Sequence, residues 1–287
     1  MLSWVPPCGE CRYCRSGHEA RCQKVATVVA PKGGVLFDGT SRLSRKGEHV
    51  HHYLGVSSFA EEVVVPASGA VKVRDDAPLD VIAVVGVRGG DRSGCGAEHR
   101  RGGAGGATVA VIGCGGVGLN VVQGAKLAGA ERIVAIDVKS DKTQLAMQFG
   151  ATDRVDASRG GDAVEQLLAL VPDGVDYAFD AFGNTSTTEQ AIRMLGLGGA
   201  AVIVGLPPTG ARASFEPLVL AEADQRILVE LRIGAAVDRH PGIGRPIHGR
   251  SAQTGPPLVW ARRPLAEAAE AFDDLESGEA LRTLLIP

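Results

Sequence analysis

Short apolar runs and helically spaced apolar residues alternate through the second half of the chain. Residues 108–112 form an apolar run bounded by glycine, which predicts a buried strand. Residues 119–128 have apolar side chains at helical spacing, and Gly129 is placed to end that helix. A second apolar run, 132–136, ends at Asp137. The pattern predicts a strand, a glycine-rich turn, a helix and a second strand in succession.

The alternation continues as far as residue 206. We expect helices at 141–149, 163–170 and 188–195, and strands at 175–179 and 200–204. Repeated strand–helix units predict a parallel, doubly wound sheet that binds its ligand at the carboxyl ends of the strands. Residues 57–66 and 70–73, by contrast, are short and β-rich, which predicts a separate β domain before the αβ units.

Length and composition narrow the class of protein. A chain of 287 residues corresponds to about two domains. The net charge of −3 argues against a nucleic-acid partner, and no apolar run reaches the roughly 18–20 residues of a membrane helix. Residues 1–8 have neither a basic start nor a long apolar stretch, so we expect no secretory signal and a cytoplasmic location.

Four of the six cysteines, Cys8, Cys11, Cys14 and Cys22, have the spacing C-x2-C-x2-C-x7-C. Four thiolates complete the closed tetrahedral shell of a structural zinc ion, which leaves no open position for substrate. An iron–sulfur cluster or disulfides are the alternatives, but the last gap is long for the former and no export signal favours the latter. A nucleic-acid-binding zinc ribbon would need a second knuckle and a basic surface.

The glycine-rich turn has the G-x-G-x-x-G form between a predicted strand and a predicted helix. Gly113 permits the tight turn, Gly115 lets the backbone approach a pyrophosphate, and Gly118 lets the helix pack closely on the sheet. Asp137 would accept hydrogen bonds from the ribose hydroxyls and repel a 2′-phosphate, so the pattern favours NAD over NADP. A glycine loop that merely turns a strand into a helix is the alternative.

The succession of a cysteine loop, short strands and a nucleotide-binding αβ domain resembles the zinc-dependent medium-chain alcohol dehydrogenases. Several motifs resemble the long-chain branch that includes glutathione-dependent formaldehyde dehydrogenase. They lie at 38–42 (DGTSR), 52–55 (HYLG), 58–61 (SFAE), 272–275 (FDDL) and 278–283 (GEALRT). The resemblance covers roughly residues 2–86, 107–228 and 262–287.

The resemblance implies an α/β fold with two domains. Residues 107–261 would form a Rossmann NAD-binding domain with a doubly wound parallel sheet. Residues 1–86 and 262–287 would form a partial GroES-like β catalytic domain, with the structural zinc loop at 8–22. The stretches 87–106 and 229–261 depart from the family pattern and are expected to be irregular.

The resemblance also implies an activity and a set of site residues. The activity is hydride transfer to NAD from an alcohol or an S-hydroxymethyl-thiol adduct, by a homodimer in which a catalytic zinc stabilises the alkoxide. The four cysteines of the loop would hold structural zinc. The cofactor would contact Gly113, Gly115, Gly116, Val117 and Gly118 at the pyrophosphate, Asp137 and Lys142 at the ribose, Phe182, Val204, Gly205 and Leu206 at the nicotinamide, and Arg282 at a phosphate.

The catalytic zinc ligands of the family are not matched. Two of them, a Cys and a His, lie in the family before the structural zinc loop, and the sequence read from Met1 begins after that segment. The third is a Cys in a Gly-Cys-Gly turn, where this chain has Val87, whose side chain cannot bind zinc. We therefore expect no catalytic zinc site, and the alternative function is that of a catalytically inactive NAD-binding fragment or pseudoenzyme.

Both irregular stretches share an unusual composition. Residues 86–106 contain nine glycines and four arginines, and residues 229–261 contain five glycines, four prolines and four arginines. Arginine also supplies 23 of the 30 basic residues, which is typical of a GC-rich gene. We hypothesise that both stretches are translated out of frame relative to the ancestor, with a divergent flexible loop as the alternative. The coding DNA tests this, because another frame should restore a Gly-Cys-Gly turn near codon 87.

Overall fold

The computed structural model describes residues 2–3, 5–29, 34–70, 72–73, 75–76, 78–79, 83, 106–158, 160–229, 259, 261–277 and 282–287. These residues fall into two compact units. Unit 1 contains the described residues up to 83 together with 259 and those from 261 onward, and unit 2 contains those from 106 to 229. Val87 and the stretches 87–105 and 230–258 lie outside the described residues, so the expectations for them stay predictions.

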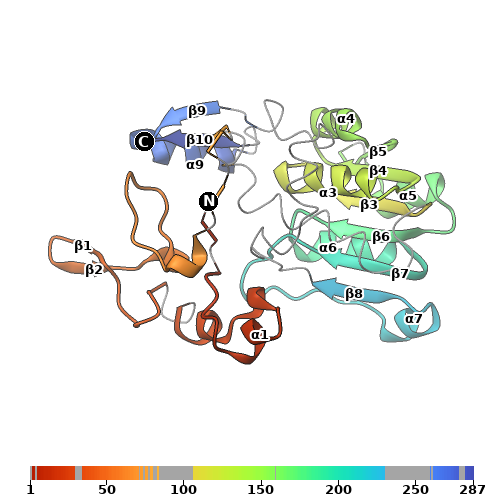
Figure 1. Cartoon of the computed structure of the whole chain (residues 1–287). Coiled ribbons are helices and arrows are strands. Elements are labelled where there is room, and N and C mark those ends of the chain that lie inside the picture. The colour runs from red at the N-terminus through yellow and green to blue at the C-terminus, as the bar shows by residue number, and fades with distance from the viewer. Residues whose placement is uncertain are drawn as a thin grey trace. The chain divides into compact units, whose positions relative to one another are not determined.

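Unit 2 is built on one six-stranded parallel sheet in the order β5-β4-β3-β6-β7-β8 (Figure 1). The strand order reverses beside β3, at the β3–β6 pair, which is where open parallel sheets of this type bind ligands. The strands are β3 (Thr108–Ile112), β4 (Arg132–Asp137), β5 (Asp153–Asp156), β6 (Val175–Asp180), β7 (Leu195–Ile203) and β8 (Arg226–Val229). The prediction of an α/β fold with a doubly wound parallel sheet is therefore confirmed.

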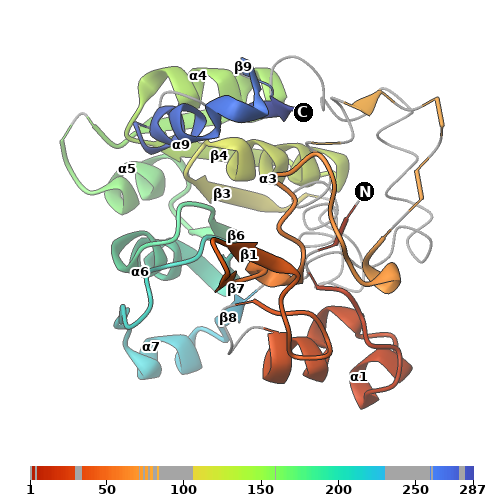
Figure 2. The same cartoon turned by 90° about the vertical axis from the view of Figure 1, so that its left-hand side faces the viewer.

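The helices of unit 2 connect successive strands. They are α3 (Gly116–Leu127), α4 (Ser140–Phe149), α5 (Ala163–Leu170), α6 (Thr185–Arg193) and α7 (Pro217–Glu222). Helix α3 packs on α4, and α5 packs on α6 (Figure 2). Because parallel crossovers are right-handed and the strand order runs outward in both directions from β3, the two pairs cover opposite faces of the sheet.

Both sheet faces are buried, so the central strands are continuous apolar runs rather than alternating ones. Ala110, Val134 and Ala178 are fully buried in adjacent strands, and Leu167 of α5 packs in the same cluster. This burial supplies the main stabilisation of unit 2, at roughly 25 cal/mol for each Å² of apolar surface removed from water.

Helix α3 begins three residues earlier than predicted. It starts at Gly116, with Gly115 as its N-cap, instead of at residue 119. Apolar periodicity does not detect this first turn because Gly116 and Gly118 have no side chains to mark a face. Helix α4, by contrast, ends as predicted at Gly150, whose φ of 117° suits a glycine.

The helix predicted at 188–195 is displaced toward the N-terminus. Helix α6 covers Thr185–Arg193, because Asn184 and Thr187 exchange hydrogen bonds in a capping box that starts it earlier. Strand β7 then begins at Leu195, which pairs with Val175 of β6, instead of at residue 200. The predicted end at Val204 is one residue late.

Unit 1 contains short elements. Its helices are α1 (Arg12–Arg15), α9 (Ala268–Glu276) and single turns at Glu19–Arg21, Val25–Val29, Tyr53–Gly55, Ala67–Gly69 and Leu265–Glu267. Its strands are β1 (Leu43–Arg45) and β2 (Glu48–Val50), which form an antiparallel hairpin, and β9 (Ala261–Pro264) and β10 (Thr283–Ile286), which pair in parallel.

The prediction of β structure at 57–66 and 70–73 is wrong for the described residues. Residues 57–66 form no strand, and Ala70 makes only an isolated bridge with Leu2. A β-rich sequence becomes a strand only where a partner strand accepts its hydrogen bonds. The hairpin formed by β1 and β2 was not predicted; its turn has positive φ at Lys46 and Gly47, the geometry that matches strand twist.

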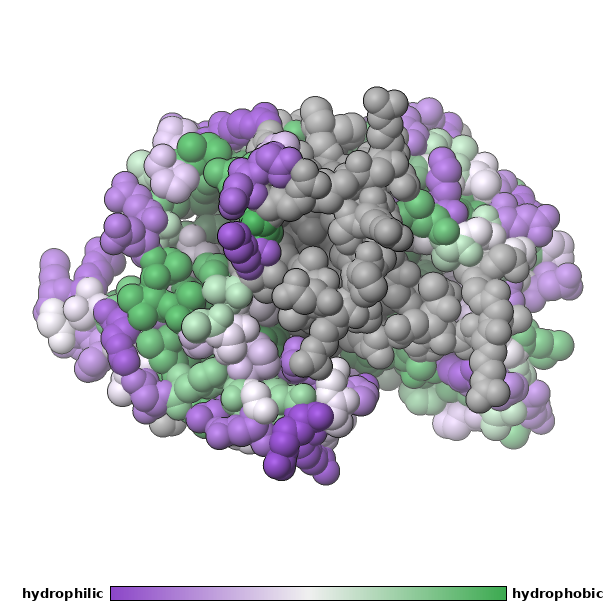
Figure 3. All heavy atoms as spheres, in the orientation of Figure 1, coloured by the Kyte–Doolittle hydropathy of each residue, from purple (hydrophilic) through white to green (hydrophobic). Residues whose placement is uncertain are grey.

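Unit 1 exposes several large apolar side chains. Tyr53, Phe59 and Val64 are each more than half exposed, and the ring of Phe59 packs edge-on against Phe272 with centroids 5.7 Å apart. Hydrophobic residues are interspersed with hydrophilic ones on the face of unit 1 drawn in Figure 3. In the part of the chain that the structure describes, no helix is long and apolar enough to cross a membrane.

Candidate functional site

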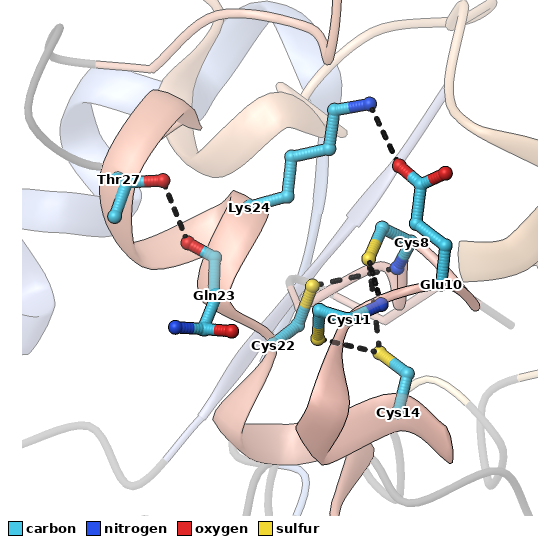
Figure 4. A network of polar contacts seen from close by, with 8 residues as sticks. All are labelled: Cys8, Glu10, Cys11, Cys14, Cys22, Gln23, Lys24 and Thr27. Atoms are coloured by element: carbon cyan, nitrogen blue, oxygen red, sulfur yellow. Dashed lines mark hydrogen bonds and ion pairs between the residues drawn. The ribbon is translucent and has the colours of Figure 1, made fainter.

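The sulfur atoms of Cys8, Cys11, Cys14 and Cys22 all lie within 4.8 Å of one another (Figure 4). Cys11 and Cys14 sulfurs are 3.5 Å apart, and those of Cys8 and Cys14 are 4.0 Å apart. No other group of three or more potential His, Cys, Asp or Glu ligands converges in this way within the described residues. The structure thus brings the four predicted cysteines together.

Local backbone geometry creates the cluster. Cys11 caps α1 and Cys14 lies inside it, so one helical turn holds two sulfurs on the same side. The backbone N–H of Cys11 donates to the Cys8 sulfur at 3.4 Å, and that of Cys8 donates to the Cys22 sulfur at 3.4 Å. Such N–H donors stabilise thiolates and orient them toward a metal.

The pKa values of the two thiols at α1 are shifted in opposite directions. Hydrogen bonding from the Cys14 backbone N–H lowers the pKa of Cys11 to about 6. Burial raises the pKa of Cys14 to about 12. A divalent cation that binds here displaces the proton of Cys14, since metals bind thiolates.

The donor set fits zinc. Four thiolates at Zn–S distances of about 2.3 Å in tetrahedral geometry give sulfur–sulfur separations of about 3.8 Å. The two separations above bracket this value, so the loop requires little rearrangement to close on an ion. Outside the cluster, Lys24 forms an ion pair with Glu10 at 3.4 Å across the loop (Figure 4).

In unit 2, the glycine-rich turn joins β3 to α3, and each glycine has a separate steric reason. A Cβ at Gly118 would lie 1.8 Å from the Gly113 carbonyl oxygen, so the helix packs against the turn only without a side chain. Gly113 has a φ of 88°, which favours glycine. A Cβ at Gly115, by contrast, would meet nothing within 4 Å.

This open space lies at the first turn of α3, and it suits a dinucleotide phosphate. The N–H groups of Gly116, Val117 and Gly118 have no acceptor within the helix, as in the first turn of any α-helix. No acidic residue lies in that turn, so the positive end of the helix dipole can attract a phosphate there. The residues present therefore fit the diphosphate of a nicotinamide cofactor.

Asp137 ends β4 beside this turn. Its Oδ2 accepts the backbone N–H of Cys114 at 2.7 Å, and its Oδ1 accepts that of Lys139 at 2.9 Å. The carboxylate thereby anchors the glycine turn to the neighbouring strand, while each oxygen keeps a lone pair for a further donor. Burial raises the pKa of the Cys114 thiol, which stays protonated as a small filler behind the turn.

The loops after β6 and β7 meet at the same sheet edge as the turn. A Cβ at Gly183 would lie 2.5 Å from the Leu206 backbone nitrogen, and one at Gly205 would lie 2.3 Å from the Gly183 nitrogen. Phe182 and Leu206 remain 65% and 70% exposed, so their apolar side chains are available to a ligand. Val204 and Gly205, in the loop after β7, are half-buried.

Two predicted cofactor residues belong to other segments of the chain than these loops. Lys142 is in the first turn of α4, after Asp137, and is half-buried. Arg282 lies in unit 1, immediately before β10. Their contacts with a cofactor stay predictions.

Asp180 is a residue that the sequence analysis missed. It ends β6 as Asp137 ends β4, and it is fully buried. An acidic residue at the end of an apolar strand was the available signal, because it marked Asp137 in the same way.

This chain thus combines a parallel sheet of the dinucleotide-binding type with a separate four-cysteine loop. The family model described as zinc-binding dehydrogenase matches residues 116–229. The S-(hydroxymethyl)glutathione dehydrogenase of Saccharomyces cerevisiae is 37% identical over 292 aligned residues, which cover 98% of this chain and 74% of the relative.

Two further comparisons support the same family. A probable S-(hydroxymethyl)glutathione dehydrogenase of Schizosaccharomyces pombe is 39% identical over 78% of this chain, which spans 59% of that relative's length. The crystal structure of an alcohol dehydrogenase zinc-binding domain protein from Burkholderia ambifaria superposes with a TM-score of 0.86 at 28% identity, covering 100% of this chain and 77% of that one. The chain belongs to the zinc-dependent medium-chain alcohol dehydrogenase family, and by family it is an alcohol dehydrogenase-type oxidoreductase that uses zinc and a nicotinamide cofactor.

Proposed function

We propose that this chain binds NAD through the turn Gly113–Gly118 and holds one structural zinc ion through its four clustered cysteines. The observation that carries the cofactor proposal is the open space over Gly115 at the start of α3. A phosphate that enters this space receives backbone N–H donors and the helix dipole without displacing any side chain.

NAD rather than NADP is proposed because of Asp137. Its carboxylate already has two backbone partners, which hold its orientation, and its free lone pairs suit the two ribose hydroxyls. A 2′-phosphate would bring a second negative charge to the same place. Lys142 is proposed to reach the same ribose, and Arg282 a cofactor phosphate, as the family resemblance implies.

The proposed reaction is the oxidation of a primary alcohol or an S-hydroxymethyl-thiol adduct, with hydride passing to the nicotinamide ring and a proton leaving the hydroxyl. The names of the two yeast relatives support the thiol adduct as substrate class. Phe182, Val204, Gly205 and Leu206 would form the nicotinamide end of the cofactor site. In the family, a catalytic zinc supplies Lewis-acid stabilisation of the alkoxide.

The second candidate is an NAD-binding protein without catalytic zinc. Val87 favours it, because valine occupies the position that matches a cysteine ligand of the family's catalytic ion. Loss of such metal stabilisation removes several kcal/mol of transition-state binding, and each 1.36 kcal/mol is about tenfold in rate.

Metal and cofactor measurements on the purified full chain separate the two candidates. About two zinc ions per chain by elemental analysis, with alcohol-dependent formation of NADH, would support the oxidoreductase. About one zinc ion, with NADH binding by calorimetry and no turnover of alcohols or of S-(hydroxymethyl)glutathione, would support the second candidate. A protein that retains no zinc and binds neither NADH nor NAD would contradict both.

The cellular location and the assembly are also proposals. We propose a cytoplasmic location, which is supported by the four-thiolate cluster, because a reducing compartment keeps such cysteines available for metal. A homodimer is proposed from the family resemblance, and light scattering of the purified chain tests it.

A further inference from the structure

The carboxylate of Asp180 is a fully buried charged group that the proposed reaction does not use. Its side chain is 0% exposed at the end of β6, the strand beside the point where the sheet order reverses. Burial of a carboxylate is costly unless hydrogen bonds replace its water shell. The partners that replace this shell therefore indicate what the carboxylate holds in place.

Three donors from two segments surround the carboxylate. Its Oδ1 accepts the backbone N–H of Phe182 at 3.1 Å and that of Gly183 at 2.9 Å. Its Oδ2 accepts the hydroxyl of Thr188, in α6, at 2.7 Å. The side chain thus bends the loop directly after β6 back onto the strand end.

The backbone of the same residue holds the neighbouring loop. The Asp180 carbonyl oxygen accepts the N–H of Val204 at 3.0 Å and that of Gly205 at 2.8 Å. The two loops are in turn too close for a side chain at Gly183 or Gly205, as the distances above show. Asp180 therefore sets the positions of both loops.

The glycine turn is packed into the same assembly. A Cβ at Gly113 would lie only 3.1 Å from the Phe182 Cβ and nitrogen, so loop 181–183 packs directly beside the first glycine of the turn. Helix capping does not account for Asp180, since Asn184 and Thr187 already form the capping box of α6. The loops that these hydrogen bonds hold carry two exposed apolar side chains, Phe182 and Leu206.

We propose that Asp180 is a positioning residue that holds the loops 181–183 and 204–206 as the wall of the nicotinamide half of the cofactor site. The proposal rests on the proposed function, because it assigns these loops to the nicotinamide. The phosphate and adenosine half depends on the turn Gly113–Gly118 and on Asp137. Loss of the Asp180 carboxylate should therefore affect the two halves of the ligand unequally.

Calorimetric binding of NADH and of ADP-ribose, which lacks the nicotinamide, tests this in the full-length protein. For Asp180→Ala we expect about tenfold weaker binding of NADH, the effect of about 1.4 kcal/mol, with ADP-ribose affinity unchanged within about twofold. The fluorescence of bound NADH should shift toward that of free NADH. In the matched control Asp173→Ala, at an exposed position before β6, both affinities should equal those of wild type.

A second variant covers the case in which Asp180→Ala does not fold. Asp180→Asn keeps an acceptor for the two backbone N–H groups, but a neutral amide oxygen accepts more weakly than a carboxylate oxygen, so we expect the same selective loss at about threefold. Equal weakening of both ligands, or no weakening of either, would overturn the proposal, as would a wild-type protein that binds NADH no more tightly than ADP-ribose. A wild-type protein that binds neither ligand would instead contradict the proposed function itself.

Discussion

Gly115 and Gly118 lie three residues apart in one turn, yet they are glycines for different reasons. At Gly118 a methyl group would overlap the Gly113 carbonyl oxygen, so the packing of α3 on the turn excludes any side chain. At Gly115 a methyl group would meet no protein atom. Gly118 is therefore required by the fold, and Gly115 leaves room for the proposed phosphate.

This contrast gives a prediction with its own control. Gly118→Ala should destabilise the protein by about 3 kcal/mol, because the backbone oxygen cannot move aside as a flexible side chain could. Gly115→Ala should remain folded, with a loss of at most about 1 kcal/mol at the N-cap, but should bind NADH at least tenfold more weakly, because the methyl group occupies the phosphate space. Thermal unfolding and NADH titration measure both. Wild-type NADH affinity in Gly115→Ala would contradict the assignment of the site.

Among the secondary-structure elements, an ion pair joins the starts of β4 and β5. Arg132 donates through Nε and Nη2 to the two oxygens of Asp153 at 2.9 and 2.8 Å, and through Nη1 to the Leu170 carbonyl at the end of α5 at 2.6 Å. The bidentate geometry makes this pair stronger than an ordinary surface pair. The guanidinium lowers the pKa of Asp153 below its ordinary value.

Stability should therefore depend on pH through this pair. Asp153→Asn should cost about 1 kcal/mol at neutral pH. The pKa of Asp153 is lower in the folded state than in the unfolded state. The stabilisation by the ion pair is therefore complete at pH values above the unfolded-state pKa of about 3.9, and it is lost as the pH falls through the lower folded-state pKa. Denaturant unfolding of wild type and variant should thus differ at pH 7 and converge in strong acid. The matched control is Asp173→Asn, at an exposed position, and an equal loss there would contradict the role of the pair.

The elements also show what local patterns can predict. The strands β3 and β4 and the helices α4 and α5 follow the apolar pattern closely, because the strands are buried on both faces and each helix has one buried face. The start of α6 depended instead on the Asn184–Thr187 capping box, and the hairpin at 43–50 has no buried face at all. Periodicity cannot detect elements whose side chains are exposed.

For the whole molecule, the two proposed sites belong to separate units. The four cysteines lie in unit 1, where Val5 and Val25 pack against them, and the glycine turn lies in unit 2. The cysteine cluster and the glycine turn are each formed by residues of one unit, so metal binding is expected to stabilise unit 1 without contributing directly to the sheet of unit 2.

Metal removal tests this separation. When zinc is removed from the loaded protein by a chelator, hydrogen exchange should accelerate in residues 8–22, because binding energy that orders the loop is lost. Exchange in residues 108–137 should change little. Equal acceleration in both segments would contradict the independence of the two units.

The metal content of cysteine variants gives a complementary prediction. Cys14→Ser should lower the zinc content by about one ion per chain, because the shell loses one of its four ligands. Cys114→Ser is the matched control: this buried thiol contacts the Ile136 carbonyl and should leave the zinc content unchanged. A zinc content that falls equally in both variants would show that global unfolding, and not ligand loss, causes the release.

The sequence alone determined the features that depend on neighbours along the chain. The cysteine spacing, the glycine turn and the strand–helix alternation are local, and bond lengths and backbone sterics leave them few alternatives. These were sufficient to predict the family and the α/β fold. Only the tertiary structure decided that Asp180 is buried and that loops 181–183 and 204–206 meet at its carboxyl and carbonyl groups, because such contacts depend on which strands become adjacent. The sequence around a single acidic residue at the end of an apolar strand does not indicate which residues more than twenty positions away will form hydrogen bonds with it.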